Sequence, residues 1–146
     1  MSSGPDPRRV VVGIGNAARG DDAAGLIAAR RLHGVEYEGD PVALLDAWQG
    51  AEVAVVIDAV RSGAAPGTVH RFDASRTPLP AALRSSSSTH AVGLAEAIEL
   101  GRALARLPPR LIVYGIEGER FDAGDGLTPA VAAAIGAVAA AVLAGP

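Results

Sequence analysis

The sequence predicts an α/β fold, a three-layer sandwich in which helices cover both faces of a mostly parallel sheet. Two observations support this prediction. Several unbroken apolar runs are typical of strands that are buried on both faces. These runs alternate with segments of helical spacing, in the order strand–helix–strand–helix–strand–strand–helix–strand–helix. A chain of 146 residues suits one domain with a sizeable core, so we expect a single domain over residues 1–146.

The first half of the chain contains two expected strands and two expected helices. The apolar run Val10–Ile14 predicts a buried strand, and the apolar spacing of Asp22–Leu32 predicts a helix. We expect Gly34 to cap the C-terminus of this helix, because glycine is favoured there. Val35–Glu38 is a second candidate strand, and an N-cap followed by proline predicts a short helix over Asp40–Trp48.

The second half begins with the clearest strand of the chain, Val53–Val60. Alternation over Thr68–Phe72 predicts an edge strand, and apolar spacing over His90–Leu104 predicts a helix. Leu111–Ile116 is the last expected strand and Thr128–Leu143 the last expected helix. Together with the first half, this completes the α/β alternation.

The stretch Asp73–Thr89 shows no firm periodic pattern and ends in four serines, Ser85–Ser88, and a threonine. A loop of this length is uncommon in a compact domain, and such loops are often functional or mobile. The serines have two open interpretations, a loop that closes over a substrate or a plain flexible linker.

Composition excludes several classes of function. Without cysteine there is no disulfide, thiolate nucleophile or zinc–thiolate site. A net charge of -3 gives no electrostatic footprint for nucleic acid or an anionic membrane. The N-terminal segment lacks the apolar region of a signal peptide. We therefore expect a cytoplasmic protein that is a monomer and binds neither nucleic acid nor membrane.

A glycine-rich turn with two carboxylates follows the first strand. Residues 13–25 place Asp21 and Asp22 where a helix should begin. Such turns usually hold phosphate, and Gly13-Ile-Gly15-Asn-Ala-Ala18 formally matches a nucleotide-binding fingerprint. Two carboxylates at that helix start would repel a pyrophosphate, so the turn favours a cation.

Three ionisable residues are predicted at the same edge of the sheet. Asp22 begins the first helix, Asp58 lies near the carboxyl end of the central strand, and His90 begins the helix after the serines. In a parallel sheet, strand carboxyl ends and helix N-termini share one edge. Two carboxylates and an imidazole there make a plausible site for a divalent transition metal with open positions.

Each of these residues also has an ordinary structural interpretation. Asp21 and Asp22 could stabilise the helix N-terminus. With Asp22 in the candidate metal site, we expect Asp21 to be the residue that does only that. Asp58 could be a turn residue at the strand end, and His90 an exposed residue of a first helical turn. We interpret the other two histidines, His33 and His70, as structural, at a helix end and on an edge strand.

An ordered set of motifs resembles the hydrogenase maturation endopeptidases, which trim the C-terminal extension of the large subunit of nickel–iron hydrogenases. The resemblance spans nearly the whole chain, and the ordered set is much more specific than any one motif. The matching segments are Gly13-Ile14-Gly15-Asn16, Gly20-Asp21-Asp22 with Gly25, Ile57-Asp58-Ala59, Pro66-Gly67-Thr68, His90-Ala-Val-Gly93-Leu94, Gly115-Ile116-Glu117 and Gly126-Leu127-Thr128-Pro129.

The resemblance implies a twisted five-stranded sheet between helices and a metal site of Asp22, Asp58 and His90. It implies that this trio recognises nickel already inserted in the hydrogenase large-subunit precursor. The substrate protein would supply the nickel, although the isolated protein could also hold another divalent metal. Some family members have Glu in place of Asp22, which keeps an oxygen donor, and many have Pro in place of Ala17.

We therefore predict an endopeptidase that cleaves the nickel-loaded precursor, with Asp22, Asp58 and His90 as both catalytic and metal-contacting residues. The sequence has no Cys and no Gly-x-Ser-x-Gly elbow, so a water activated by the metal or by a carboxylate is favoured over covalent catalysis. Two alternatives stay open. One is a non-catalytic metal-sensing or chaperone module that binds the precursor, and the other is a small nucleotide-binding α/β domain.

Overall fold

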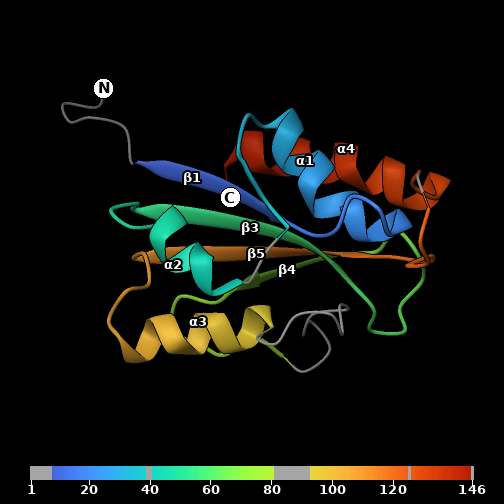
Figure 1. The fold of residues 1–146 in the computed structure, drawn as a ribbon. Helices are drawn as coiled ribbons and strands as arrows, with labels where there is room; N and C mark the ends of the chain where they lie inside the picture. The colour runs from blue at the N-terminus through green and yellow to red at the C-terminus, as the bar shows by residue number, and fades with distance from the viewer. Residues whose placement is uncertain (1–7, 39–40, 81–92, 125, 146) are drawn as a thin grey trace.

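Five strands form one sheet in the order β2-β1-β3-β5-β4 (Figure 1). Strand β4 runs antiparallel to β5, and the other neighbouring pairs are parallel. The computed structural model describes residues 8–38, 41–80, 93–124 and 126–145. The strands are β1 (Arg9–Ile14), β2 (Val35–Tyr37), β3 (Val53–Val60), β4 (Val69–Asp73) and β5 (Arg110–Glu117). The predicted mostly parallel, five-stranded sheet is confirmed.

Helices cover both faces of this sheet, which confirms the three-layer prediction (Figure 1). Helices α1 and α4 lie on one face, and α2 and α3 lie on the other. Their bounds are α1 (Ala24–Arg31), α2 (Leu44–Ala47), α3 (Leu94–Ala103) and α4 (Pro129–Ala144), with 3-10 turns η1 (Gly20–Ala23) and η2 (Pro41–Ala43). Within the described part of the chain, no helix has the length and apolar character needed to cross a membrane.

The central strand β3 divides its side chains between two cores. Val55, Ile57 and Ala59 pack with α1 and α4. Ala54 and Val56 pack with α2, α3 and Trp48 on the opposite face. Successive side chains of a strand point to opposite faces, so an apolar run without interruption is what a strand covered on both sides requires.

The C-terminal end of α1 differs from the prediction. His33, rather than Gly34, takes the left-handed conformation, with φ of 56°. Gly34 instead lies against β1, where an added Cβ would collide with the carbonyl oxygen of Val11. Glycine is needed at this position because the chain passes close to the strand, whereas the turn itself is formed by the residue before it.

Two other helix starts also differ from the prediction. The helix expected from His90 begins at Leu94, because Gly93 has extended backbone (φ -80°, ψ 172°) and is the N-cap. The helix expected over Asp40–Trp48 consists of η2 followed by the single turn α2. His90, Asp40 and Ser85–Ser88 lie outside the described residues.

Candidate functional site

The chain leaves β1 and β3 in opposite directions along the sheet. β1 connects through α1 to β2 on one side, and β3 leads to β4 and β5 on the other. A crevice forms at such a switch point, outside the carboxyl ends of the strands, where α/β proteins bind ligands. The pairing of β1 with β3 ends at Ile57, whereas β3 continues beside β5 with Asp58 opposite Gly115. Asp58 therefore lies at the switch point and inside the strand, so its interpretation as a turn residue is wrong.

Three glycines bring the beginning of α1 against this end of the sheet. A Cβ on Gly25 would collide with the carbonyl oxygens of Ile14 and Ile57. A Cβ on Gly15 would collide with the carbonyl oxygen of Asp22, and one on Gly13 with the backbone of Gly25. The close approach seats the turn that carries Asp22 beside the strand end that carries Asp58.

Asp22 and Asp58 interact as like charges in a buried place. Their exposed fractions are 3% and 4%. Burial raises the pKa of Asp58 well above its ordinary value, and the negative charge of Asp22 raises it further. The backbone N–H of Ala59 opposes this by donating a hydrogen bond to the Asp58 carboxylate. A divalent cation between the two carboxylates would relieve their repulsion.

The structure thus brings together two of the three predicted site residues. The third, His90, lies outside the described residues, so its place stays a prediction. Searched without His90, the described part of the chain holds no group of three His, Cys, Asp or Glu side chains that could bind a metal ion. Asp22 and Asp58 provide carboxylate oxygens only, which leaves room for further donors.

Asp21 has a different role from the helix-start role expected for it. No side chain caps the 3-10 turn Gly20–Ala23. The Asp21 carboxylate is fully buried and instead accepts hydrogen bonds from the loop between β5 and α4. Burial raises its pKa, but the bonds from the backbone of Arg120, Thr128 and Glu119 and from the Thr128 hydroxyl outweigh burial and lower it. Hydrogen bonding therefore lowers the pKa of Asp21, whereas burial and the charge of Asp22 raise the pKa of Asp58.

Glu117 is a buried carboxylate that the reasoning from residues did not single out. It ends β5 at the same edge of the sheet and accepts hydrogen bonds from the backbone N–H and hydroxyl of Ser62, at 2.8 and 2.5 Å. His70 Nε2 lies 3.1 Å from Glu117 Oε1. Although burial raises the pKa of Glu117, the hydrogen bonds of Ser62, His70 and Gly63 lower it overall. An acidic residue at the end of an apolar strand was the signal available in the sequence.

The placements expected for the two structural histidines are confirmed. His33 follows the last turn of α1, and His70 lies on the edge strand β4. His70 joins the edge strand to the end of β5 through Glu117.

A small pocket of about 180 Å³ lies beside the turn that carries Asp21 and Asp22. Its walls come from α1, from the turn after β1 and from the loop before α4. The lining residues are Ala17, Gly20, Ala23, Leu26, Ile27, Arg30, Gly126 and Leu127.

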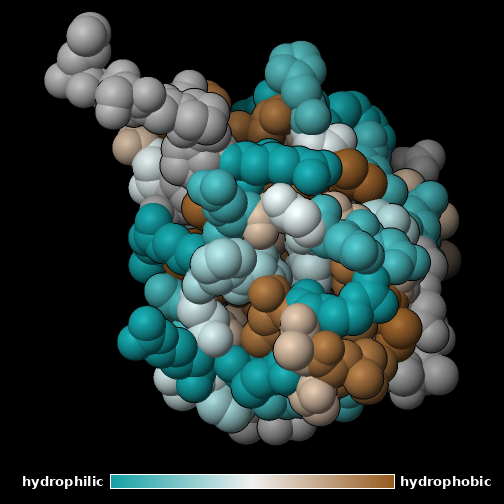
Figure 2. All heavy atoms as spheres, turned by 90° about the vertical axis from the view of Figure 1, so that its left-hand side faces the viewer, coloured by the Kyte–Doolittle hydropathy of each residue, from teal (hydrophilic) through white to brown (hydrophobic). Residues whose placement is uncertain are grey.

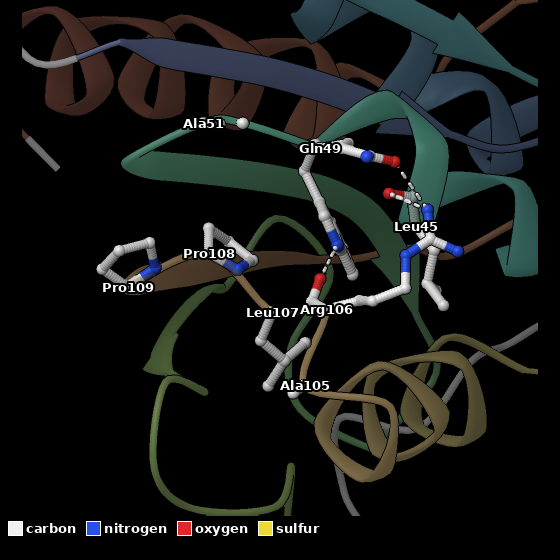
Figure 3. A pocket seen from close by; sticks show the side chains of 10 residues that line it. Leu45, Gln49, Ala51, Ala105, Arg106, Leu107, Pro108 and Pro109 are labelled. Carbon is white, nitrogen blue, oxygen red and sulfur yellow. Dashed lines mark hydrogen bonds between the residues drawn. The ribbon is translucent and has the colours of Figure 1, made fainter.

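A second pocket, of about 320 Å³, opens at the opposite end of the sheet, before β3 and β5 begin (Figure 3). The indole N–H of Trp48 donates to the carbonyl of Arg106 at 2.8 Å. The Arg106 guanidinium donates to Asp46 and Gln49, both at 2.9 Å. Figure 2 views this end of the molecule, where hydrophobic surface gathers in the lower part, at the height of α3. The polar groups at this pocket are hydrogen-bonded to one another. We therefore place the candidate site at the carboxyl end of the sheet.

Comparison with known proteins gives consistent matches. A family model described as hydrogenase maturation protease matches residues 39–145. The hydrogenase expression/formation protein HupD of Thiocapsa roseopersicina is 32% identical over 137 residues, which are 86% of this chain and 62% of that protein. This chain thus spans less than two thirds of that relative. HupD of Bradyrhizobium diazoefficiens is 30% identical over 141 residues, 89% of this chain and 73% of that protein.

The fold is also found among solved structures. The hydrogenase maturating endopeptidase HybD from Escherichia coli superposes with a TM-score of 0.78 at 28% sequence identity. The superposition covers 94% of this chain and 90% of that one. The described architecture is therefore shared over almost the full length of both chains.

Proposed function

Since the chain belongs to the hydrogenase maturation protease family, we propose that it is an endopeptidase that removes the C-terminal extension of a nickel-loaded hydrogenase large-subunit precursor. The observation that carries this proposal is the buried pair Asp22 and Asp58 at the switch point of the sheet. Burial raises the pKa of Asp58 and the charge of Asp22 raises it further, so a cation between the two carboxylates would be favourable.

His90 completes the proposed contact with the metal. It precedes Gly93, the N-cap of α3, by three residues in the sequence. Helix α3 begins at the same end of the molecule as the carboxyl ends of β3 and β5 (Figure 1). Asp58 shares its face of β3 with Ala54 and Val56, which is the face covered by α3. This common side supports a role for His90 beside Asp58.

In the proposed reaction the nickel belongs to the substrate. Asp22, Asp58 and His90 contact it, and the peptide bond to be cut lies nearby. Water attacks the carbonyl carbon, the C–N bond breaks, and the leaving nitrogen takes a proton. A carboxylate of the site or the metal would activate this water, because the sequence contains no cysteine nucleophile.

The decisive experiment incubates the protein with a nickel-loaded large-subunit precursor and determines the product mass. We expect a precursor shortened at its C-terminus, and no shortening of the nickel-free precursor. Asp22→Asn should abolish cleavage, whereas Asp122→Asn, which removes an equal charge at an exposed position, should not. An uncut nickel-loaded precursor, with folded wild-type protein, would defeat the proposal.

The same measurement separates the protease from a non-catalytic module. Such a module would bind the nickel-loaded precursor and leave its mass unchanged. His90→Ala would weaken binding in both cases and cannot distinguish them. Mass spectrometry of the precursor therefore decides between the two functions.

We further propose that nickel is brought by the precursor rather than held permanently by this protein. Calorimetric titration of the isolated chain with nickel chloride tests this directly. Weak or no binding to the free chain, together with cleavage of the loaded precursor, is the expected pair of results. Tight binding of nickel by the isolated wild-type chain would contradict it. Analytical ultracentrifugation would test the expected monomer.

A further inference from the structure

Asp21 is the buried carboxylate that the proposed chemistry does not use. Its two oxygens accept four hydrogen bonds. Oδ2 accepts from the N–H groups of Glu119 and Arg120, at 2.8 and 3.0 Å, and from the Thr128 hydroxyl at 2.8 Å. Oδ1 accepts from the N–H of Thr128 at 2.8 Å. Bonds to an ionised acceptor are roughly twice as strong as neutral ones.

These four bonds reach both ends of the loop between β5 and α4. Glu119 and Arg120 lie two and three residues after the end of β5, and Thr128 is the N-cap of α4. The Thr128 side chain makes no capping bond to its own helix and bonds Asp21 instead. The Thr128 hydroxyl therefore joins the start of α4 to Asp21 and does not cap the helix.

Backbone bonds join the same loop to the turn after β1. The N–H of Asp21 donates to the carbonyl of Arg120 at 2.7 Å. The N–H of Gly20 donates to the carbonyl of Gly124 at 3.0 Å, and the N–H of Gly124 donates to Ala18 at 2.9 Å. Asp21 thus lies at the centre of the hydrogen bonds between the turn of residues 18–21 and the loop of residues 119–128, which are about a hundred residues apart in the sequence. We call this set of hydrogen bonds the seam.

The seam adjoins both Asp22 and the pocket of about 180 Å³. Asp22 is the next residue of the same turn, and its backbone is seated against Gly15 with little room to adjust. The loop supplies Gly126 and Leu127 to the pocket of about 180 Å³ beside that turn. A change in the seam would therefore displace Asp22 and one wall of the pocket together.

We propose that Asp21 is a positioning residue for substrate binding, whose carboxylate fixes the β5–α4 loop against the turn that carries Asp22. This inference rests on the proposed function and adds a residue to it. Groups that orient metal-contacting residues without touching the metal typically contribute 10- to 100-fold to affinity or activity. Asp21 does this through the backbone and the loop rather than by contact with the substrate.

The test compares the steady-state KM and Vmax of four variants on nickel-loaded precursor. We expect Asp21→Asn to raise KM about 10-fold or more, because its amide cannot accept all four bonds. Thr128→Val should raise KM about fivefold, and Thr128→Ser, which keeps the hydroxyl, should stay within about twofold of wild type. Asp122→Asn, an exposed acid in the same loop, is the control for charge and should also stay within about twofold.

A merely structural role gives a different kinetic result. Partial unfolding lowers the concentration of active protein, so Vmax falls with the folded fraction and KM does not change. Unchanged KM in Asp21→Asn and Thr128→Val would overturn the proposal, as would an equal rise in KM for Thr128→Ser. If Asp21→Asn does not fold, the Thr128 pair alone decides.

Amide hydrogen exchange makes the positioning step testable without cleavage. In Thr128→Val we expect faster exchange at Glu119, Arg120 and in the turn of Gly20–Asp22, with the strands unchanged. Unchanged exchange there would overturn the proposal even if KM rises. A wild-type chain that fails to cut the precursor would refute the proposed function, while the exchange result would still report on the seam.

Discussion

Burial raises the pKa of Asp58, and the negative charge of Asp22 raises it further across the carboxyl ends of β1 and β3. Neither residue is near the other in the sequence, and both are buried. The tight seating of Gly25 against the carbonyls of Ile14 and Ile57 creates this relationship, because it brings the start of α1 onto the strand ends. Ionising both buried carboxylates lowers the stability of the fold, and a cation bound between them would offset their repulsion.

Replacing Asp58 by Asn should raise the unfolding temperature at pH 7 while abolishing cleavage of nickel-loaded precursor. The pKa of Asp58 is raised in the folded protein, so its proton stabilises the fold at low pH and this stability is lost as the pH rises toward the raised pKa. The difference between wild type and Asp58→Asn should therefore shrink below about pH 4, where both side chains are neutral. Thermal unfolding followed by circular dichroism at both pH values checks this. A lower unfolding temperature of the variant at pH 7 would contradict it.

Glu117→Gln should show the opposite pH dependence. The pKa of Glu117 is lowered in the folded protein, so its charge stabilises the fold above its unfolded pKa, and this stability is lost as the pH falls through the folded value. At pH 7 we expect a loss of about 1–3 kcal/mol, since the amide would face the Ser62 N–H and hydroxyl. Urea unfolding followed by the fluorescence of the single tryptophan, the buried Trp48, measures it.

Gly25→Ala should destabilise the fold by about 1–3 kcal/mol and lower cleavage, because the new methyl group forces α1 away from the strand ends. Gly136→Ala is the matched control within α4. Its methyl group would meet only Arg31, at 3.6 Å, so the helix should gain up to about 1 kcal/mol. Urea unfolding and cleavage of the two variants side by side test the prediction. Equal effects of the two substitutions would show that close helix–strand contact does not position the site.

Trp48→Phe should lower stability by about 1 kcal/mol or more and leave cleavage per folded molecule unchanged. The substitution removes the indole donor to the Arg106 carbonyl at the amino end of the sheet. Circular dichroism during urea unfolding gives the stability, and KM for nickel-loaded precursor gives the binding. A rise in KM would place part of the substrate surface at the end of the molecule seen in Figure 2.

Local patterns predicted most of the fold. The apolar runs Val10–Ile14 and Val53–Val60 became β1 and β3, because a continuous apolar strand has to be buried on both faces. Helix starts were less predictable. α3 begins at Leu94 rather than at His90, since apolar spacing does not reveal the extended backbone of Gly93.

By itself, the sequence determined the α/β class and the common edge for Asp22 and Asp58. These follow from the hydrophobic period and from the strand–helix order. That the glycine-rich turn favours a cation stays a prediction from the charge of its adjacent aspartates. Only the tertiary structure decided the separate roles of Asp21 and Asp22. The partners of Asp21 are Glu119, Arg120 and Thr128, and nothing in a local pattern indicates hydrogen bonds across so many intervening residues. Two neighbouring carboxylates look equivalent in a sequence. In the folded chain, hydrogen-bond donors from distant segments outweigh burial and lower the pKa of Asp21, whereas burial and then the charge of Asp22 raise the pKa of Asp58.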